Sequence, residues 1–143
     1  MQRGLALLVR REHSRTELAR KLVERGIERE QAHEVVNRLV AEGWQSDERF
    51  LGMLVRTRVS QGYGPVRIRA ELRTHGLEGA PVGDALEASE CDWAQVARDQ
   101  ARRKFGEGLY LDPALARKAA DFLYRRGFDG DMVRGALRRD IRD

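Results

Sequence analysis

The chain has 143 residues, 35% of them charged and 41% hydrophobic, a length that suits one ordinary domain or a short array of very small ones. A single cysteine excludes an internal disulfide framework. No apolar run approaches the ~18 residues of a membrane span, so we expect no membrane contact and a cytoplasmic location. The 27 basic residues, 24 of them arginines, exceed the 23 acidic ones by four. This small excess does not by itself predict nucleic-acid binding.

The N-terminal third predicts three helices. The first is short, and its apolar residues are Leu5, Leu8 and Val9. Ser14, with Glu17 three residues later, is a capping-box pattern that opens a helix over about residues 14–25. A third helix is expected over about residues 28–42, with an apolar face of Ala32, Val35, Val36, Leu39 and Val40.

Glycines and prolines mark the later helices. Gly62 suits the end of one helix, Gly64 the N-cap of the next, and Pro65 its first residue. Further helices are expected over about residues 65–75, 81–89, 113–126 and 129–142. The segment 106–108 is expected to be the loosest linker. No stretch alternates with period two, so we expect essentially no β-sheet.

An internal repeat underlies this pattern. The helix-ending glycines Gly26, Gly76 and Gly127 recur at a spacing of about 50 residues, and a basic residue precedes each. Apolar residues occupy matching positions around them: Leu22, Leu72 and Leu123; Ile27, Leu77 and Phe128; Ala32, Val82 and Val133; Val36, Leu86 and Leu137. We predict an all-α chain of three tandem three-helix repeats, at residues 1–44, 45–89 and 90–143. Units this small bury their apolar faces by stacking on one another.

Enzyme chemistry finds little support in the residues. The three histidines lie on different helices or turns, with none of the spacings of a zinc site. The segment 62–65 lacks the sequence of a phosphate-binding loop, so helix punctuation explains its glycines better. Tyr63 remains on a turn, where it can contact a partner. We expect no catalytic residue, no cofactor and no metal site.

Charge is distributed in blocks. Residues 49–75 contain six arginines and one glutamate, residues 77–97 contain five acidic residues and no basic one, and residues 98–104 are again basic. Such blocks are either solvated helix faces or surfaces for an acidic protein groove or a phosphate backbone. The candidate partner-binding residues are Tyr63, Arg67, Arg69, Arg73, Arg102, Arg103 and Lys104.

Tandem helical units also resemble helix-turn-helix modules, which makes a nucleic-acid-binding module a rival function. The helix starts near residues 28–34 and 82–87 are acidic, however, and phosphates would repel them. The last helix is a better candidate for nucleic-acid contact, with Arg134, Arg138 and Arg139. Trp44 and Trp93 are expected to pack in the core or between units. A generic helical scaffold for protein interactions is the third alternative.

Several stretches together resemble the RecX family, regulators of the recombinase RecA. The most specific is the Gly-Tyr-Gly-Pro segment with its following helix, at residues 62–72. The others are residues 10–18, 46–50, 92–93, 103–106 and 124–128. They follow the family's order and span nearly the whole chain.

This resemblance implies three tandem three-helix repeats in an elongated, curved array, which agrees with the period found above. It also implies binding of the RecA–single-stranded DNA filament, with inhibition of its ATPase and strand exchange, by groove binding or by blocking a filament end. We expect a monomer that makes at most weak direct contact with DNA. Family members often carry a longer polar segment before the first helix; if that segment contacts the filament, this chain is expected to bind it more weakly.

Overall fold

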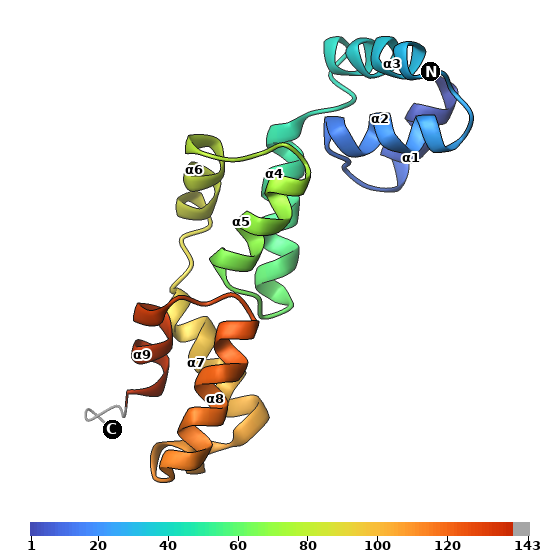
Figure 1. Cartoon of the computed structure of the whole chain (residues 1–143). Coiled ribbons are helices and arrows are strands. Elements are labelled where there is room, and N and C mark those ends of the chain that lie inside the picture. The colour runs from blue at the N-terminus through green and yellow to red at the C-terminus, as the bar shows by residue number, and fades with distance from the viewer. Residues whose placement is uncertain (139–143) are drawn as a thin grey trace. The chain divides into compact units, whose positions relative to one another are not determined.

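A computed structural model describes residues 1–138, and within this range the secondary structure is helical with no β-strand (Figure 1). The all-α prediction is therefore confirmed for these residues. None of their helices combines the length and the hydropathy that crossing a bilayer requires. The elements are α1 (Gln2–Arg10), α2 (Arg15–Glu24), α3 (Arg29–Ala41), α4 (Asp47–Ser60), α5 (Pro65–Thr74), α6 (Ala80–Ala88), α7 (Trp93–Phe105), the 3-10 helix η1 (Glu107–Tyr110), α8 (Pro113–Arg125) and α9 (Gly130–Leu137).

Side-chain caps explain where several helices begin. Ser14 Oγ accepts a hydrogen bond from the backbone N–H of Glu17 at 3.1 Å, which satisfies one of the free donors in the first turn of α2. The Glu17 carboxylate does not complete the capping box as expected, because it accepts two hydrogen bonds from Arg11, at 2.7 and 3.1 Å. Aspartates cap three later helices in the same way: Asp92, Asp112 and Asp129.

The repeating glycines end the middle helices as predicted. Gly26, Gly76 and Gly127 have φ angles of +91°, +73° and +94°, in the left-handed region that a residue with a Cβ enters only with strain. Leucines four residues before these glycines are completely buried: Leu22, Leu72 and Leu123. The last helix ends at Leu137 in the described range, and its predicted extension over residues 139–142 lies outside the described residues.

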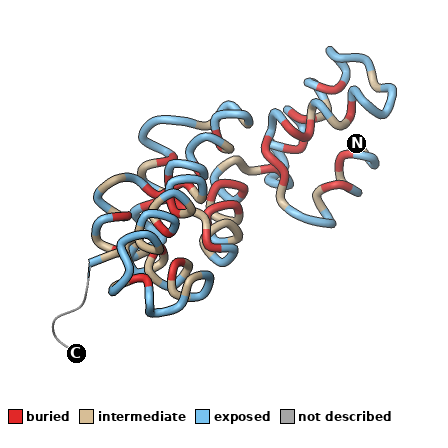
Figure 2. The backbone as a smooth tube through the Cα atoms, turned by 60° about the horizontal axis from the view of Figure 1, so that its bottom comes forward, coloured by how far each residue is buried: buried red, intermediate tan, exposed pale blue. Residues whose placement is uncertain are grey.

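The first compact unit contains Met1–Leu54 and Leu72–Ala85. Helices α1, α2 and α3 pack on one another there, and the buried positions line their inner faces (Figure 2). This core consists of Leu7, Leu18, Leu22, Ala32, Val36 and Leu39. Two predictions were wrong: Val40 and Trp44 are exposed, Trp44 to 54%. Val9 of α1 is exposed as well. The apolar stripes of α1 and α3 are thus narrower than their sequences indicate.

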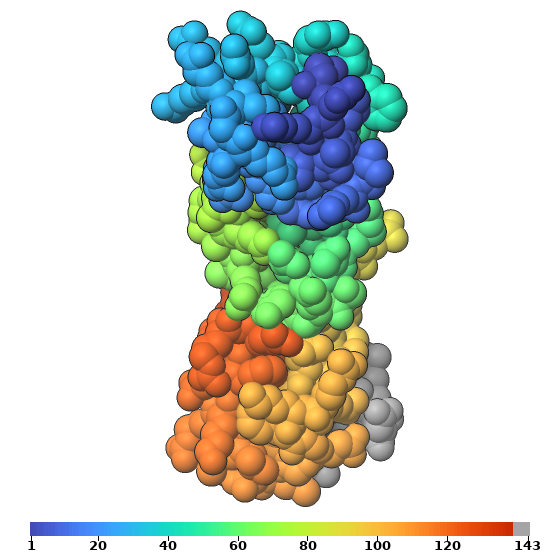
Figure 3. Space-filling view, turned by 90° about the vertical axis from the view of Figure 1, so that its right-hand side faces the viewer, coloured from blue at the N-terminus to red at the C-terminus, as the bar shows by residue number. Residues whose placement is uncertain are grey.

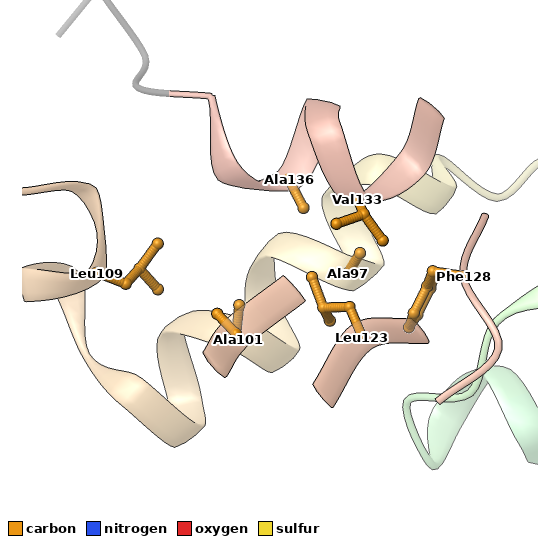
Figure 4. Packing of buried hydrophobic residues seen from close by; sticks show 8 residues of the cluster. Ala97, Ala101, Leu109, Leu123, Phe128, Val133 and Ala136 are labelled. Atoms are coloured by element: carbon orange, nitrogen blue, oxygen red, sulfur yellow. The ribbon is translucent and has the colours of Figure 1, made fainter. Parts of the chain in front are cut away.

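The second compact unit contains Val55–Glu71 and the described residues from Leu86 to Arg138. Figure 4 shows Ala97 and Ala101 of α7 facing Leu123 of α8 and Val133 and Ala136 of α9. The small alanines allow these three helices to approach closely. Trp93 packs against this core, as predicted.

The linker predicted to be loosest is partly ordered. Glu107–Tyr110 forms η1, which places Leu109 in the core of the second unit at 1% exposure. A single well-placed leucine anchors the segment despite its two glycines, because burying a leucine side chain contributes about 2 kcal/mol.

His13 introduces a pH dependence into the first unit. Its ring is buried, its Nδ1 lies 3.0 Å from the carbonyl oxygen of Arg11, and its Nε2 lies 3.1 Å from the ammonium of Lys21. Burial lowers the pKa of His13 below its ordinary value, and the positive charges of Arg11 and Lys21 lower it further. The folded chain therefore holds this imidazole neutral at a pH where the unfolded chain protonates it.

We expect the free energy of unfolding to fall as the pH decreases through about 6.5, because the unfolded state then binds more protons than the folded state. The decrease should be smaller in His13→Gln than in the wild type. Urea unfolding at several pH values measures it. Equal pH dependence in His13→Gln and the wild type would contradict this account of His13.

Candidate partner-binding surface

Each compact unit contains a joint of the same kind, in which the start of one helix meets the end of a later one. The start of α2 meets the end of α5 in the first unit, and the start of α5 meets the end of α8 in the second. In the first unit, Ser14 at the start of α2 contacts His75 just after α5, with 2.6 Å between Oγ and Nδ1. The ring of His75 also lies against Phe50, with 4.6 Å between the ring centroids. Gly76, the residue after His75, faces Thr16.

The joint in the second unit uses backbone groups. The N–H of Gly64, before α5, donates to the carbonyl oxygen of Arg126 at 2.8 Å, and the N–H of Val66 donates to that of Gly127 at 2.9 Å. A Cβ on Gly64 would collide with the Gly127 carbonyl, and one on Gly127 would lie 2.6 Å from the backbone nitrogen of Arg67. Both glycines are therefore required by close approach of two backbones.

This second joint assembles cations and aromatic rings from different helices. The guanidinium carbon of Arg67 lies 4.1 Å from the ring centroid of Tyr63, and that of Arg126 lies 4.3 Å from the same centroid. Arg126 also lies 5.5 Å from the ring centroid of Phe122, and the ammonium of Lys104 lies 4.4 Å from the same centroid. We call this series Arg67, Tyr63, Arg126, Phe122 and Lys104 the cation–aromatic row.

The row lies where the end of α4, the start of α5 and the ends of α7 and α8 meet. Figure 3 shows the end of α4 and the second half of α8 adjoining on one face. Arg126 fastens these segments, because its guanidinium donates to the carbonyl oxygen of Gln61 at 3.0 Å and to Oε1 of Gln100 at 3.2 Å. The row thus depends on the joint for its geometry.

The structure gathers three of the seven candidate residues, Tyr63, Arg67 and Lys104, into this row. Sequence reasoning missed Arg126 and Phe122, which connect them. Arg102 is half-buried and lies 5.6 Å from the ring of Tyr110. The other three candidates are exposed: Arg69, Arg73 and Arg103. Arg134 and Arg138, on and just after α9, are exposed too, whereas Arg139 lies outside the described residues.

Internal ion pairs reduce the positive charge of the first basic block. Arg49 pairs with Glu12 at 2.8 Å, and Arg58 makes two hydrogen bonds of 2.7 Å with the carboxylate of Glu71. The hydrogen bond with Glu71 raises the pKa of Arg58. All five acidic residues of the following block are exposed: Glu78, Asp84, Glu87, Glu90 and Asp92. In residues 1–138, no group of three or more His, Cys, Asp or Glu side chains is arranged to hold a metal ion.

Family models match three successive parts of this chain. They describe the first, second and third three-helix domains of RecX, and they match residues 1–39, 46–86 and 90–137. The chain belongs to the RecX family. The fold predicted from the repeat, three tandem three-helix units, is thereby confirmed, and so is the family resemblance.

Curated RecX proteins are similar over the whole chain. "Regulatory protein RecX" of Xanthomonas axonopodis pv. citri (strain 306) and that of Stenotrophomonas maltophilia (strain K279a) are each 55% identical over 143 residues, which is 100% of this chain and 88% of the relative. The crystal structure of RecX from Lactobacillus salivarius matches 95% of this chain and 90% of its own, with a TM-score of 0.78 at 22% identity. At that identity the likeness supports the RecX fold alone.

Proposed function

We propose that this chain is a negative regulator of the RecA recombinase that binds the RecA–single-stranded DNA filament in the cytoplasm and inhibits its ATPase and strand exchange. Membership of the RecX family is the observation that carries the proposal. The cation–aromatic row supports it, because it offers a charged contact surface assembled from two neighbouring three-helix domains. The proposed action requires binding alone, without catalysis.

Inhibition by binding imposes one physical condition. A bound regulator shifts a filament toward an inactive state only when it binds that state more tightly than the active one. Contacts made through two neighbouring domains can meet this condition, because both contacts form together only when the groups that they touch on the filament have the matching relative position. Groove binding and end blocking are both compatible with the proposal.

A titration of the chain against RecA assembled on single-stranded DNA tests the proposal. We expect ATP hydrolysis and strand exchange to decrease at or below equal molar ratio. A parallel measurement of DNA binding without RecA is the control, because a nucleic-acid-binding module would instead show direct affinity that falls steeply with salt. Unchanged ATPase and strand exchange at molar excess would refute the proposed function.

Arg69 and Arg73 provide a separate test on α5. They are four residues apart on one helix face and both exposed, so replacing both with glutamate should leave the helical content intact. We expect the double variant to inhibit RecA at least tenfold less effectively, a factor that corresponds to about 1.4 kcal/mol. Inhibition equal to that of the wild type would remove these two arginines from the contact surface.

A further inference from the structure

Among the described residues, no carboxylate compensates the three cations of the row. Across residues 1–138, no Asp or Glu oxygen lies within 4.0 Å of the charged nitrogens of Arg67, Arg126 or Lys104. The described acceptors of Arg126 are uncharged, one carbonyl and one amide oxygen. Its positive charge is therefore held in place without being neutralised.

The aromatic rings of the row are already occupied by these cations. Tyr63 contacts Arg67 and Arg126, and Phe122 contacts Arg126 and Lys104. Both rings are half-buried. A platform for single-stranded nucleic acid requires rings whose faces are free to stack with bases. The rings of this row serve instead to hold the cations, through the attraction between positive charge and the ring face.

The groups left to bind from outside are the exposed guanidinium of Arg67 and the exposed ammonium of Lys104. Arg126 contributes its positive charge, because its Nε is buried and its Nη2 already donates to two oxygens. A guanidinium that stacks on a ring keeps its edge free for the two parallel hydrogen bonds that a carboxylate accepts. Together with the charge of Arg126, these two donors form one connected series of positive charges around the two rings. An extended acidic peptide carries carboxylates along its length and is complementary to such a series.

We propose that the cation–aromatic row is the docking surface for a carboxylate-rich segment of a protein partner, with Arg67 and Lys104 pairing with its carboxylates and Arg126 adding the attraction of its positive charge. This inference rests on the proposed function only for the identity of the partner, and it adds the chemistry of the segment that is bound. Tyr63 is a positioning residue in this surface, since it touches the cations that make the contacts.

Binding of two matched probes tests the inference. Fluorescence anisotropy in about 0.15 M salt compares a labelled peptide of ten glutamates with a labelled oligothymidine of similar charge. The row variant combines Arg67→Glu and Lys104→Glu. The control variant combines Arg10→Glu and Arg29→Glu, which changes the net charge equally at two exposed positions of the first unit.

We expect the wild type and the control to bind the peptide more tightly than the oligonucleotide, and the row variant to lose at least tenfold in peptide affinity. Peptide binding that is absent, or that both variants lose equally, would overturn the inference. Tighter binding of the oligonucleotide, lost only in the row variant, would also overturn it and identify the row as a nucleic-acid surface.

The RecA titration separates this inference from the proposed function. A wild type that binds the peptide through the row and leaves RecA active refutes the proposed function and leaves the docking chemistry in place. A row variant that inhibits RecA as well as the wild type refutes the docking surface and leaves the proposed function in place. Loss of inhibition in the row variant alone supports both.

Discussion

Replacing Leu72 with aspartate is expected to unfold the first compact unit. Leu72 is fully buried, at 0% exposure, at the end of α5. Removing a buried leucine side chain costs about 2–5 kcal/mol, and placing an unpaired carboxylate in the vacated space costs several more. A total stability of about 5–15 kcal/mol does not tolerate this loss. Thermal unfolding followed by far-ultraviolet circular dichroism measures the effect.

Val66→Asp is the matched control on the same helix. Val66 is 51% exposed in the first turn of α5, where a negative charge interacts favourably with the helix dipole. We expect the free energy of unfolding of Val66→Asp to remain within about 0.5 kcal/mol of the wild-type value. If Leu72→Asp melted at the wild-type temperature, the assignment of Leu72 to the core would be wrong.

Gly127→Ala is expected to destabilise the second unit by about 3 kcal/mol. The left-handed φ of +94° costs a residue with a Cβ about 1–2 kcal/mol. The new methyl group would also meet the backbone of Arg67, and such overpacking costs about 1–3 kcal/mol. The joint between α5 and α8 would have to open to relieve the contact, which would also separate Arg67 from Arg126.

Comparison with Gly26→Ala separates the cost of the left-handed backbone from the cost of overpacking. Gly26 occupies the corresponding position after α2, with a φ of +91°, but a Cβ there would meet no atom within 4 Å. We expect it to lose only the backbone contribution, about 1–2 kcal/mol. Urea unfolding measures the free energy of unfolding of both variants. Equal losses would show that the contact between Gly127 and the backbone of Arg67 relaxes without an energetic cost.

The internal repeat made most of the fold predictable from the sequence, because the signals that define it are local. Helix-ending glycines, capping side chains and buried leucines each act within a few residues, so Gly26, Gly76 and Gly127 predicted helix ends correctly. Exposure of Trp44 was not predictable in this way. Apolar character indicates that a side chain can be buried, whereas burial depends on which surfaces the tertiary structure brings against it.

The candidate surface was predictable only in part. The charge block and the turn at Tyr63 are visible in the sequence, but the contact of Arg126 with Tyr63 joins residues more than 60 positions apart. One signal did point to Arg126, namely the basic residue that precedes each helix-ending glycine. Two members of that column, His75 and Arg126, contact the preceding domain in the structure.

The two joints differ in chemistry, so their partners are not interchangeable. Ser14 offers a hydroxyl to an imidazole, whereas Gly64 offers a bare backbone N–H to a carbonyl. A serine at Gly64 would strike the opposing main chain, and a glycine at position 14 would leave the imidazole of His75 without this hydroxyl partner. Exchanging the domains would therefore mismatch the contacts of the joint in each compact unit.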